Sequence, residues 1–308
     1  MPRRPSPTTL AHLLLLAVVI IWGATFVLVK DALQDISPLL FNLLRMALAF
    51  IALAIVNHRQ LRNINRQSIV SGLIVGLFLA AGYQFQTTGL ARTTAAKSAL
   101  ITGLVVVFVP LFTLNPAVRP QGTPRPRWTT AIGAILAFSG LLLLTTPAGT
   151  SWRNLSSSIS AGDLLTLGCA IAFAAHLLSL AHTSRKVPTA QLATLQIGAA
   201  ALIMVVTLPI GGRPHLSLTP RLVIALAITS LLATAAAFTI QSWAQQHLPP
   251  THTAILLTLE PVFACLTSFL VLHEHLGRRS LMGAALILAG IAFIEIFPPE
   301  APIPTYHA

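Results

Sequence analysis

The chain has 308 residues, of which 55% are hydrophobic and only 8% are charged, and its mean hydropathy is +0.81. A soluble domain carries about 25% charged residues, so this composition excludes an ordinary soluble protein and predicts a polytopic membrane protein. The formal net charge is +12, but the basic residues lie in short loops between apolar runs, where they set membrane orientation. No soluble face exists to carry a nucleic-acid site, so we expect a lipid bilayer and no nucleic acid as partner.

Ten apolar runs are each about long enough to cross 30 Å of hydrocarbon as a helix. They cover residues 10–29, 38–56, 68–90, 95–114, 128–146, 161–180, 191–210, 222–243, 253–272 and 281–297. The first run is long for a signal peptide and no small-residue cleavage site follows it, so we expect a retained helix. The predicted fold is all-α, with ten transmembrane helices. Cys169 and Cys265 both lie inside apolar runs and are expected to pack as small residues.

The Ser-rich stretch 147–160 divides the chain into two halves that resemble each other. Tyr83 and Gln86 match Phe238 and Gln241 at an offset of 155, and the run that starts at Gly133 matches the run that starts at Gly283. The predicted repeats are residues 1–147 and 161–298, unless the likeness is a chance similarity between Leu/Ala-rich helices. Because five helices per half is an odd number, the second half would enter the membrane from the opposite side, as in many secondary transporters.

The distribution of basic residues predicts the orientation. In the first half, eight arginines fall on the side of the N-terminus and four basic residues fall on the other side, whereas the second half shows no such bias. Since the first helices usually dominate, we expect both termini to be cytoplasmic.

The most unusual position is an acid inside an apolar run, Glu260, which is followed directly by Pro261. The run covers 253–272, so the carboxylate lies about halfway through the 30 Å of hydrocarbon. The proline leaves the carbonyl of Leu257 without its helical donor. An acid at this depth is a functional candidate: it binds a substrate amine or takes up a proton, or else it is a structural acid that holds a kink. Its counterpart in the first half is Val105, so it acts once per chain.

Two basic residues are candidates for coupling or gating. Arg45 lies about 10 Å along its helix from Pro38, where it either faces substrate, pairs with a neighbour or reaches the interface. Lys97 opens the fourth run near the predicted outer mouth, and His252 occupies the matching place in the ninth. A charge at a rim either attracts anions or is simply solvated.

Aromatic and polar residues inside the runs could line a cavity that is mostly apolar with a few polar groups, as small-ligand sites are. The candidate substrate-binding residues are Trp22, Thr25, Tyr83, Gln84, Gln86, His176, Gln241 and Trp243, with Phe85, Phe173 and Phe238 as further aromatic candidates. The alternative for each aromatic residue is packing or contact with lipid.

Nothing in the sequence predicts a cofactor or a metal. His273-Glu274-His275 invites a metal assignment, but residues two apart on a helix point apart and no further ligands accompany them. The seven acids are scattered and no phosphate-binding GxxxxGK[ST] motif occurs, so we expect neither an enzyme nor direct drive by ATP. A polytopic membrane enzyme acting on lipid-linked or small amphiphilic substrates stays as the alternative, and a channel is disfavoured because no filter loop is visible.

Several motifs resemble the drug/metabolite transporter superfamily, most closely its EamA-type ten-helix branch. They are Trp22-Gly-Ala-Thr-Phe26, Arg45, Thr94-Ala-Ala-Lys97, Leu259-Glu-Pro-Val-Phe263 and Gly283-Ala-Ala-Leu-Ile-Leu-Ala-Gly290. The resemblance covers essentially the whole chain. It implies a bacterial inner-membrane exporter of small metabolites, such as amino acids or related amphiphilic compounds. It also implies a central cavity lined by helices one, three, four, six, eight and nine.

The expected function is therefore secondary export by alternating access, driven by the substrate gradient or by proton exchange, with Glu260 as the proton carrier if protons couple. One chain can complete such a transporter, so we expect a monomer. The sequence departs from the family pattern at one place: the acid that often follows the fourth or ninth helix occurs only as Glu274, and the matching position in the first half is Arg119. The two gates should therefore differ in energy.

Overall fold

The computed structural model describes residues 6–120, 128–145, 159–248, Thr253, 256–257 and 259–296, and within them the secondary structure is helical apart from one isolated bridge between Ile36 and Leu216. The helices are α1 (Pro7–Ala32), α2 (Pro38–Val56), the 3-10 helix η1 (Gln60–Asn63), α3 (Arg66–Leu90), α4 (Ala95–Thr102), α5 (Val105–Phe112), α6 (Trp128–Thr145), α8 (Ala161–Thr183), α9 (Thr189–Thr207), the 3-10 helix η3 (Leu208–Gly211), α10 (Pro220–Ser230), the π-helical segment η4 (Leu231–Ala236), α11 (Ala237–His247), α13 (Glu260–Leu272) and α14 (Arg278–Ile296).

Side chains that cap the first turn define where many of these helices begin. The side-chain oxygens of Ser6, Asn65, Thr94 and Thr219 each accept a hydrogen bond from a backbone N–H of the first turn of α1, α3, α4 and α10. Ser160 forms a reciprocal capping box at the start of α8. Such caps satisfy donors that have no partner within the helix, which matters most where lipid offers none.

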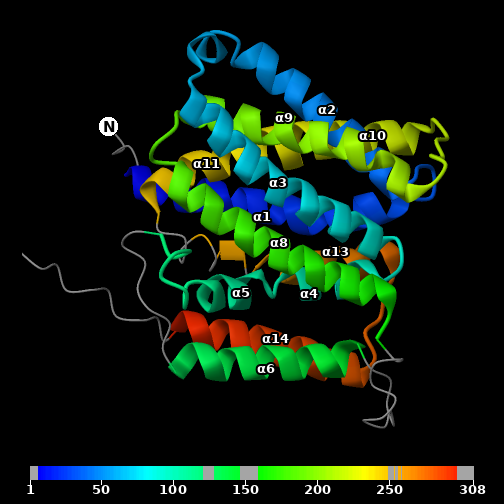
Figure 1. Ribbon diagram of the computed structural model, residues 1–308. Helices are drawn as coiled ribbons and strands as arrows, with labels where there is room; N and C mark the ends of the chain where they lie inside the picture. The colour runs from blue at the N-terminus through cyan, green and yellow to red at the C-terminus, as the bar shows by residue number, and fades with distance from the viewer. Residues whose placement is uncertain are drawn as a thin grey trace, which may run out of the picture.

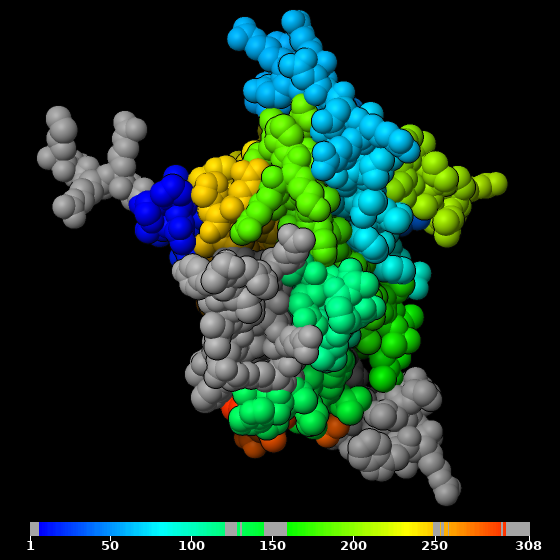
Figure 2. All heavy atoms as spheres, turned by 60° about the vertical axis from the view of Figure 1, so that its left-hand side comes forward, coloured from blue at the N-terminus to red at the C-terminus, as the bar shows by residue number. Residues whose placement is uncertain are grey.

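The helices form a bundle with α1 and α13 near its middle (Figure 1). The pair α6 and α14 lies along one edge and α2 along the opposite edge. The space-filling view agrees, since the atoms of α6 and α14 gather at the end of the molecule opposite to the residues around η1 (Figure 2). Many large apolar side chains on the outside are more than half exposed, among them Ile55, Leu202, Val206 and Leu270. An outward face of this kind suits contact with lipid.

Within the described residues, seven helical stretches are long and apolar enough to cross a membrane, and two shorter apolar ones, Ala131–Leu144 and Glu260–Leu272, accompany them. Each of the ten runs found in the sequence contains a helix, but the ten complete spans and the inverted repeat stay predictions. Two runs differ from the expectation of continuous helices. The fourth is interrupted after Thr102, and in the ninth α13 begins at Glu260, with Pro261 in its first turn rather than at a kink inside it.

The two interruptions face each other in the core. A Cβ added to Gly103 would lie 2.6 Å from Cγ of Pro261, and one added to Gly23 on α1 would lie 2.6 Å from Cβ of Phe263. The chain therefore needs glycine at both positions for the close approach of α1, α4 and α13. Leu104 and Leu259, the turn residues at the two interruptions, are also separated by the offset of 155 that relates the two halves of the sequence.

Helix α3 from the first half packs mainly against α8 and α9 from the second half. Glycines make the contact close: a Cβ on Gly76 would lie 2.6 Å from Cβ of Ala199, and one on Gly89 would lie 2.6 Å from Oγ1 of Thr166. Small residues at helix contacts are typical of membrane bundles. The halves thus share a core instead of folding as two separate bundles.

Candidate functional site

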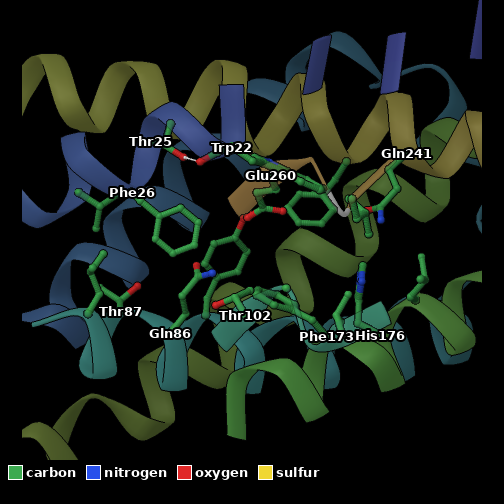
Figure 3. Close-up of a pocket in the computed structure, with 18 of the residues that line it drawn as sticks. Trp22, Thr25, Phe26, Gln86, Thr87, Thr102, Phe173, His176, Gln241 and Glu260 are labelled. Atoms are coloured by element: carbon green, nitrogen blue, oxygen red, sulfur yellow. Dashed lines mark hydrogen bonds between the residues drawn. The ribbon is translucent and has the colours of Figure 1, made fainter. Parts of the chain in front are cut away.

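A cavity lies inside the bundle and is lined by residues from both halves (Figure 3). The space not filled by atoms is about 780 Å³ when the open solvent at the mouth is included. Its lining is Trp22, Thr25, Phe26, Val29, Arg45, Tyr83, Gln86, Thr87, Leu90, Thr102, Gly103, Val105, Phe173, His176, Leu177, Phe238, Gln241, Leu257 and Glu260. Apolar walls with a few polar groups are characteristic of small-molecule sites.

Aromatic rings form a continuous part of the wall. The ring of Tyr83 meets Phe173 edge-on at 5.3 Å and Phe238 at 6.1 Å between centroids. Phe238 also lies 5.4 Å from Trp22 and 5.6 Å from His176. Tilted and edge-on pairs at these separations are favourable for aromatic rings, so the wall is a packed surface and not a set of independent side chains.

Arg45 reaches this wall from α2 and is 3% exposed. Its Nε donates to Oγ1 of Thr234 at 2.7 Å, and its Nη2 donates to the hydroxyl of Tyr83 at 3.0 Å and to the carbonyl of Ala233 at 3.3 Å. Among the described residues its hydrogen-bond partners are neutral. A buried guanidinium needs acceptors for its N–H groups, because burying the charge without them is very costly.

The π-helical segment η4 supplies two of these acceptors. In it the carbonyl of Ala233 also accepts a hydrogen bond from Nε1 of Trp22 at 2.8 Å, and Oγ1 of Thr234 donates to the carbonyl of Thr229 at 2.8 Å. A π segment departs from the regular pattern of helical hydrogen bonds. Here the carbonyl of Ala233 accepts instead from Trp22 of α1 and Arg45 of α2. Neither Ala233 nor Thr234 was a candidate from the sequence, because a π segment inside an apolar run has no signal that sequence reasoning could use.

Glu260 is the first residue of α13, and its largely buried side chain faces the cavity (Figure 3). The positive end of the helix dipole favours a carboxylate at this position. Within the part of the chain that the structure describes, no hydrogen bond or ion pair to this carboxylate is formed. It is therefore available to a ligand, in contrast to the paired Arg45.

Comparison with known proteins identifies the family of the chain. The sequence profile of the EamA-like transporter family matches residues 9–146 and 160–296. The chain belongs to the EamA-like transporter family. It is thus related to transporters of the drug/metabolite transporter superfamily, as its motifs indicated, and it is an integral membrane protein.

Several named relatives are similar to this EamA-like chain over most of its length. An "Uncharacterized transporter" of Archaeoglobus fulgidus is 32% identical over 286 residues, which are 93% of this chain and 86% of that one. The "Uncharacterized transporter YoaV" of Bacillus subtilis is 25% identical, with 92% and 95% covered. The "WAT1-related protein At3g02690, chloroplastic" of Arabidopsis thaliana is 27% identical, with 90% and 67% covered. A solved crystal structure with 19% identity aligns with a TM-score of 0.67 over 95% of this chain and 98% of that chain, which supports the fold alone.

Six of the eight candidate substrate-binding residues of the EamA-like protein line the cavity, together with Arg45 and Glu260. The six are Trp22, Thr25, Tyr83, Gln86, His176 and Gln241. Gln84 lies outside the lining and is bonded to Asn42 and Thr207. Trp243 also lies outside it, with its ring 4.5 Å from that of His247.

His176 is held in place by a chain of hydrogen bonds that leads away from the cavity. Its Nε2 lies 3.0 Å from Oε1 of Gln196, and Nε2 of Gln196 donates to Oγ of Ser242 at 3.1 Å. All three residues are buried. The hydrogen bond with Gln196 therefore fixes the orientation of the His176 ring, and the ring still lines the cavity.

Charged residues gather at the end of the bundle where α1 ends. Lys97 is not in the cavity lining and pairs instead with Asp163 at 2.7 Å. Glu274 accepts hydrogen bonds from the backbone N–H groups of Ala95 and Ala96 at 3.2 Å each, and so caps α4 from the second half of the chain. The left-handed backbone of His273, with φ of 52°, turns the chain there.

A second ion pair closes the same end. Both oxygens of Asp35 accept from Arg221 at 2.9 Å, and Thr219 donates to Asp35 as well. The hydrogen bonds from Arg221 and Thr219 hold the pKa of Asp35 below its ordinary value. The ion pairs of Lys97 with Asp163 and of Arg221 with Asp31 and Asp35 thus lie at this one end. That the two gates differ in energy, as Glu274 and Arg119 suggest, stays a prediction.

The described residues contain no group of three His, Cys, Asp or Glu side chains that could hold a metal ion. His273 and His275 are exposed. The expectation of no metal and no cofactor stays a prediction.

Proposed function

We propose that this protein is a secondary transporter that exports small metabolites, amino acids or related amphiphilic compounds, by alternating access. The observation that carries the proposal is the cavity itself, which is enclosed by helices from both halves and contains one carboxylate without a partner among the described residues. The interrupted fourth and ninth runs meet at this cavity. Broken helices around a central site are a common device of secondary transporters.

The arrangement of charge supports an amphiphilic solute. Aromatic faces attract organic cations and bury apolar groups, and Glu260 offers a counter-charge to an amine. The same carboxylate is the proposed proton carrier, since an acid in an apolar cavity is neutral or charged according to what binds next to it. A solute and a proton would then compete for one site, which is the simplest form of exchange.

We also propose how the chain is inserted in the membrane. Residues 1–147 and 161–298 would be oppositely inserted repeats within a single working chain. The bacterial inner membrane would hold it, with both termini cytoplasmic. The equal offset of the two helix interruptions supports the repeat. On this orientation, the charged end described above faces outward.

Transport assays in proteoliposomes test the proposal. Flux of candidate amino acids and amphiphilic amines is measured with and without a pH gradient for the wild type, for Glu260→Gln and for Asp31→Asn, a control acid that is partly exposed at the end of α1. We expect Glu260→Gln alone to lose the pH-driven flux. Full pH-driven flux in Glu260→Gln would rule out this carboxylate as the carrier.

The alternative of a membrane enzyme is separated by a different measurement. An enzyme forms its product in detergent solution, where no compartment exists, whereas a transporter changes only the location of its solute. Transformation of a substrate by the detergent-solubilised protein would favour the enzyme.

A further inference from the structure

Two adjacent glutamines near the end of α11 have opposite environments. The amide nitrogen of Gln246 donates to the carbonyl of Ser184 and to Oγ1 of Thr189, at 2.8 Å each. Gln245 is 3% exposed, and neither its Oε1 nor its Nε2 has a hydrogen-bond partner among the described residues. A buried amide without partners is costly, so Gln245 needs an explanation that Gln246 does not.

Gln245 continues the face of α11 that lines the cavity. Phe238, Gln241 and Gln245 are separated by three and four residues, which places them on one side of the helix, and the first two line the cavity. Oε1 of Gln241 is also without a partner within the described chain. Gln241 and His176 lie at one end of the cavity, and Thr87 and Phe26 lie at the other (Figure 3). The unpaired amides therefore lead from the cavity toward the end at which α1 begins.

Apolar side chains pack beside α11 at this end. Ala11 and Leu15 of α1 form a buried cluster with Ala244 of α11 and with Leu248, which directly follows that helix, and Leu256 packs against it. Thr253, on the chain between Leu248 and Leu256, is another buried side chain whose hydroxyl has no partner in the described part of the chain. These contacts are not directional, and separating them would admit water to the amides.

The opposite end is sealed in a different way. Lys97 with Asp163, Arg221 with Asp35, and Glu274 with the first turn of α4 are charged contacts between the two halves. Opening that end separates paired charges, which is most unfavourable for the buried carboxylate of Asp163. Opening the end near Gln245 exposes apolar surface but hydrates at least three unpaired atoms, so part of its cost is offset.

We propose that the face of α11 carrying Gln241 and Gln245 is the wall of the path by which the cavity opens to the end where α1 begins. In the conformation seen here this path is closed by the apolar cluster, and water and a solute with hydrogen-bonding groups enter along it when α1 and α11 separate. The burial of Gln245 raises the energy of the closed state and so favours opening at this end first. The identity of the solute rests on the proposed function, but the path does not.

The experiment measures opening directly, without a solute. Val105, which lines the cavity, is replaced by cysteine in a chain whose Cys169 and Cys265 are alanine. The protein is reconstituted into vesicles, and a charged maleimide that does not cross lipid is added on the side where α1 begins. The labelling rate of Val105→Cys is compared with and without Gln245→Leu, and the matched control is Gln246→Leu.

We expect Gln245→Leu to slow labelling about tenfold, because the closed state no longer holds unpaired amide atoms, and to raise the Tm in detergent. Gln246→Leu should lower the Tm, since it removes two hydrogen bonds, and should not slow labelling. Labelling that is unchanged by Gln245→Leu, a lower Tm for that variant, or labelling only from the opposite side would each overturn the path.

This outcome is separable from the proposed function. If no solute is transported while labelling responds to Gln245→Leu as expected, the path stands and the transport assignment is wrong. If solutes are transported and labelling does not respond, the transport assignment stands and this path is wrong.

Discussion

The guanidinium of Arg45 lies over the ring of Tyr83, with its central carbon 4.3 Å from the ring centroid, and also donates to the hydroxyl of the same residue at 3.0 Å. One aromatic side chain therefore supplies both a π face and an acceptor to a cation buried in the middle of the bundle. Through its bonds to Tyr83, Thr234 and Ala233, the single side chain of Arg45 connects α2 to α3 and to the π segment. Arg45 thus has a structural role at the wall of the cavity.

Replacing Thr234 by valine tests this role. The change removes the acceptor for Nε of Arg45 and leaves a buried charged donor unpaired, so we expect the free energy of unfolding to fall by about 1–3 kcal/mol. Thr239→Val is the control, because among the described residues the hydroxyl of Thr239 bonds only to the carbonyl of Ala235 one turn earlier. The measurement is the Tm in detergent, and equal effects of the two changes would contradict the role assigned to Thr234.

The close approach of α4 and α13 predicts a strong effect at Gly103. In Gly103→Ala the new Cβ would lie 2.6 Å from the ring of Pro261, which cannot rotate away. Overpacking of this kind costs about 1–3 kcal/mol, and the shift should displace Glu260 and reduce transport. Gly277→Ala meets nothing within 4 Å and should leave both the Tm and transport unchanged. A well-folded, fully active Gly103→Ala protein would show that the two interrupted runs need not touch.

The ion pairs at the charged end should differ widely in their contribution. Asp163 is 2% exposed and holds Lys97, whereas Asp31 is 36% exposed and holds Arg221. Lys97→Met leaves the Asp163 carboxylate without its counter-charge and should destabilise by about 3–5 kcal/mol. Asp31→Asn breaks an exposed pair and should cost less than about 1 kcal/mol. Unfolding followed by tryptophan fluorescence in denaturant ranks the two, and the reverse order would refute the pairing.

Asp35 makes stability at this end depend on pH. Since Arg221 and Thr219 lower the pKa of Asp35 in the folded protein, its contribution is fully present above the pKa of the unfolded chain. The contribution is lost as the pH falls through the lower, folded-state value. Asp35→Asn should therefore reduce the Tm at pH 7, and the difference from wild type should shrink as the pH approaches about 3, below the ordinary aspartate pKa. A difference in Tm that is constant between pH 7 and pH 3 would contradict this linkage.

Much of the site could be predicted because its residues are unusual for their place in the sequence. An acid, an arginine and several amides are rare in apolar runs, so Glu260, Arg45, Gln86 and Gln241 stand out, and all four line the cavity. Gln84 stands out equally but is two residues from Gln86, and so points to a different side of α3. Composition selects candidates, but only the rotation of a helix separates those that face the cavity.

The features that sequence reasoning missed depend on long-range geometry. The pairing of Lys97 with Asp163 joins residues 66 apart in the chain, and no local pattern predicts it. The interruption of the ninth run agrees with the preference of proline for the first turn of a helix. The sequence alone could not distinguish this break from a kink inside a continuous helix, because proline can cause either. The π segment at Thr234 has no sequence signature at all.

The close contacts at Gly76 and Gly89 of α3 have a consequence for the order in which the helices pack during synthesis. Their partners, Ala199 and Thr166, belong to helices synthesised well after α3 has entered the lipid. Before α8 and α9 are inserted, we expect lipid chains to occupy the space beside Gly76 and Gly89. Assembly of the bundle must therefore wait for the second half of the chain, so a nascent polypeptide stalled at the Ser-rich divider should be inserted in the membrane yet unfolded in the sense of helix packing.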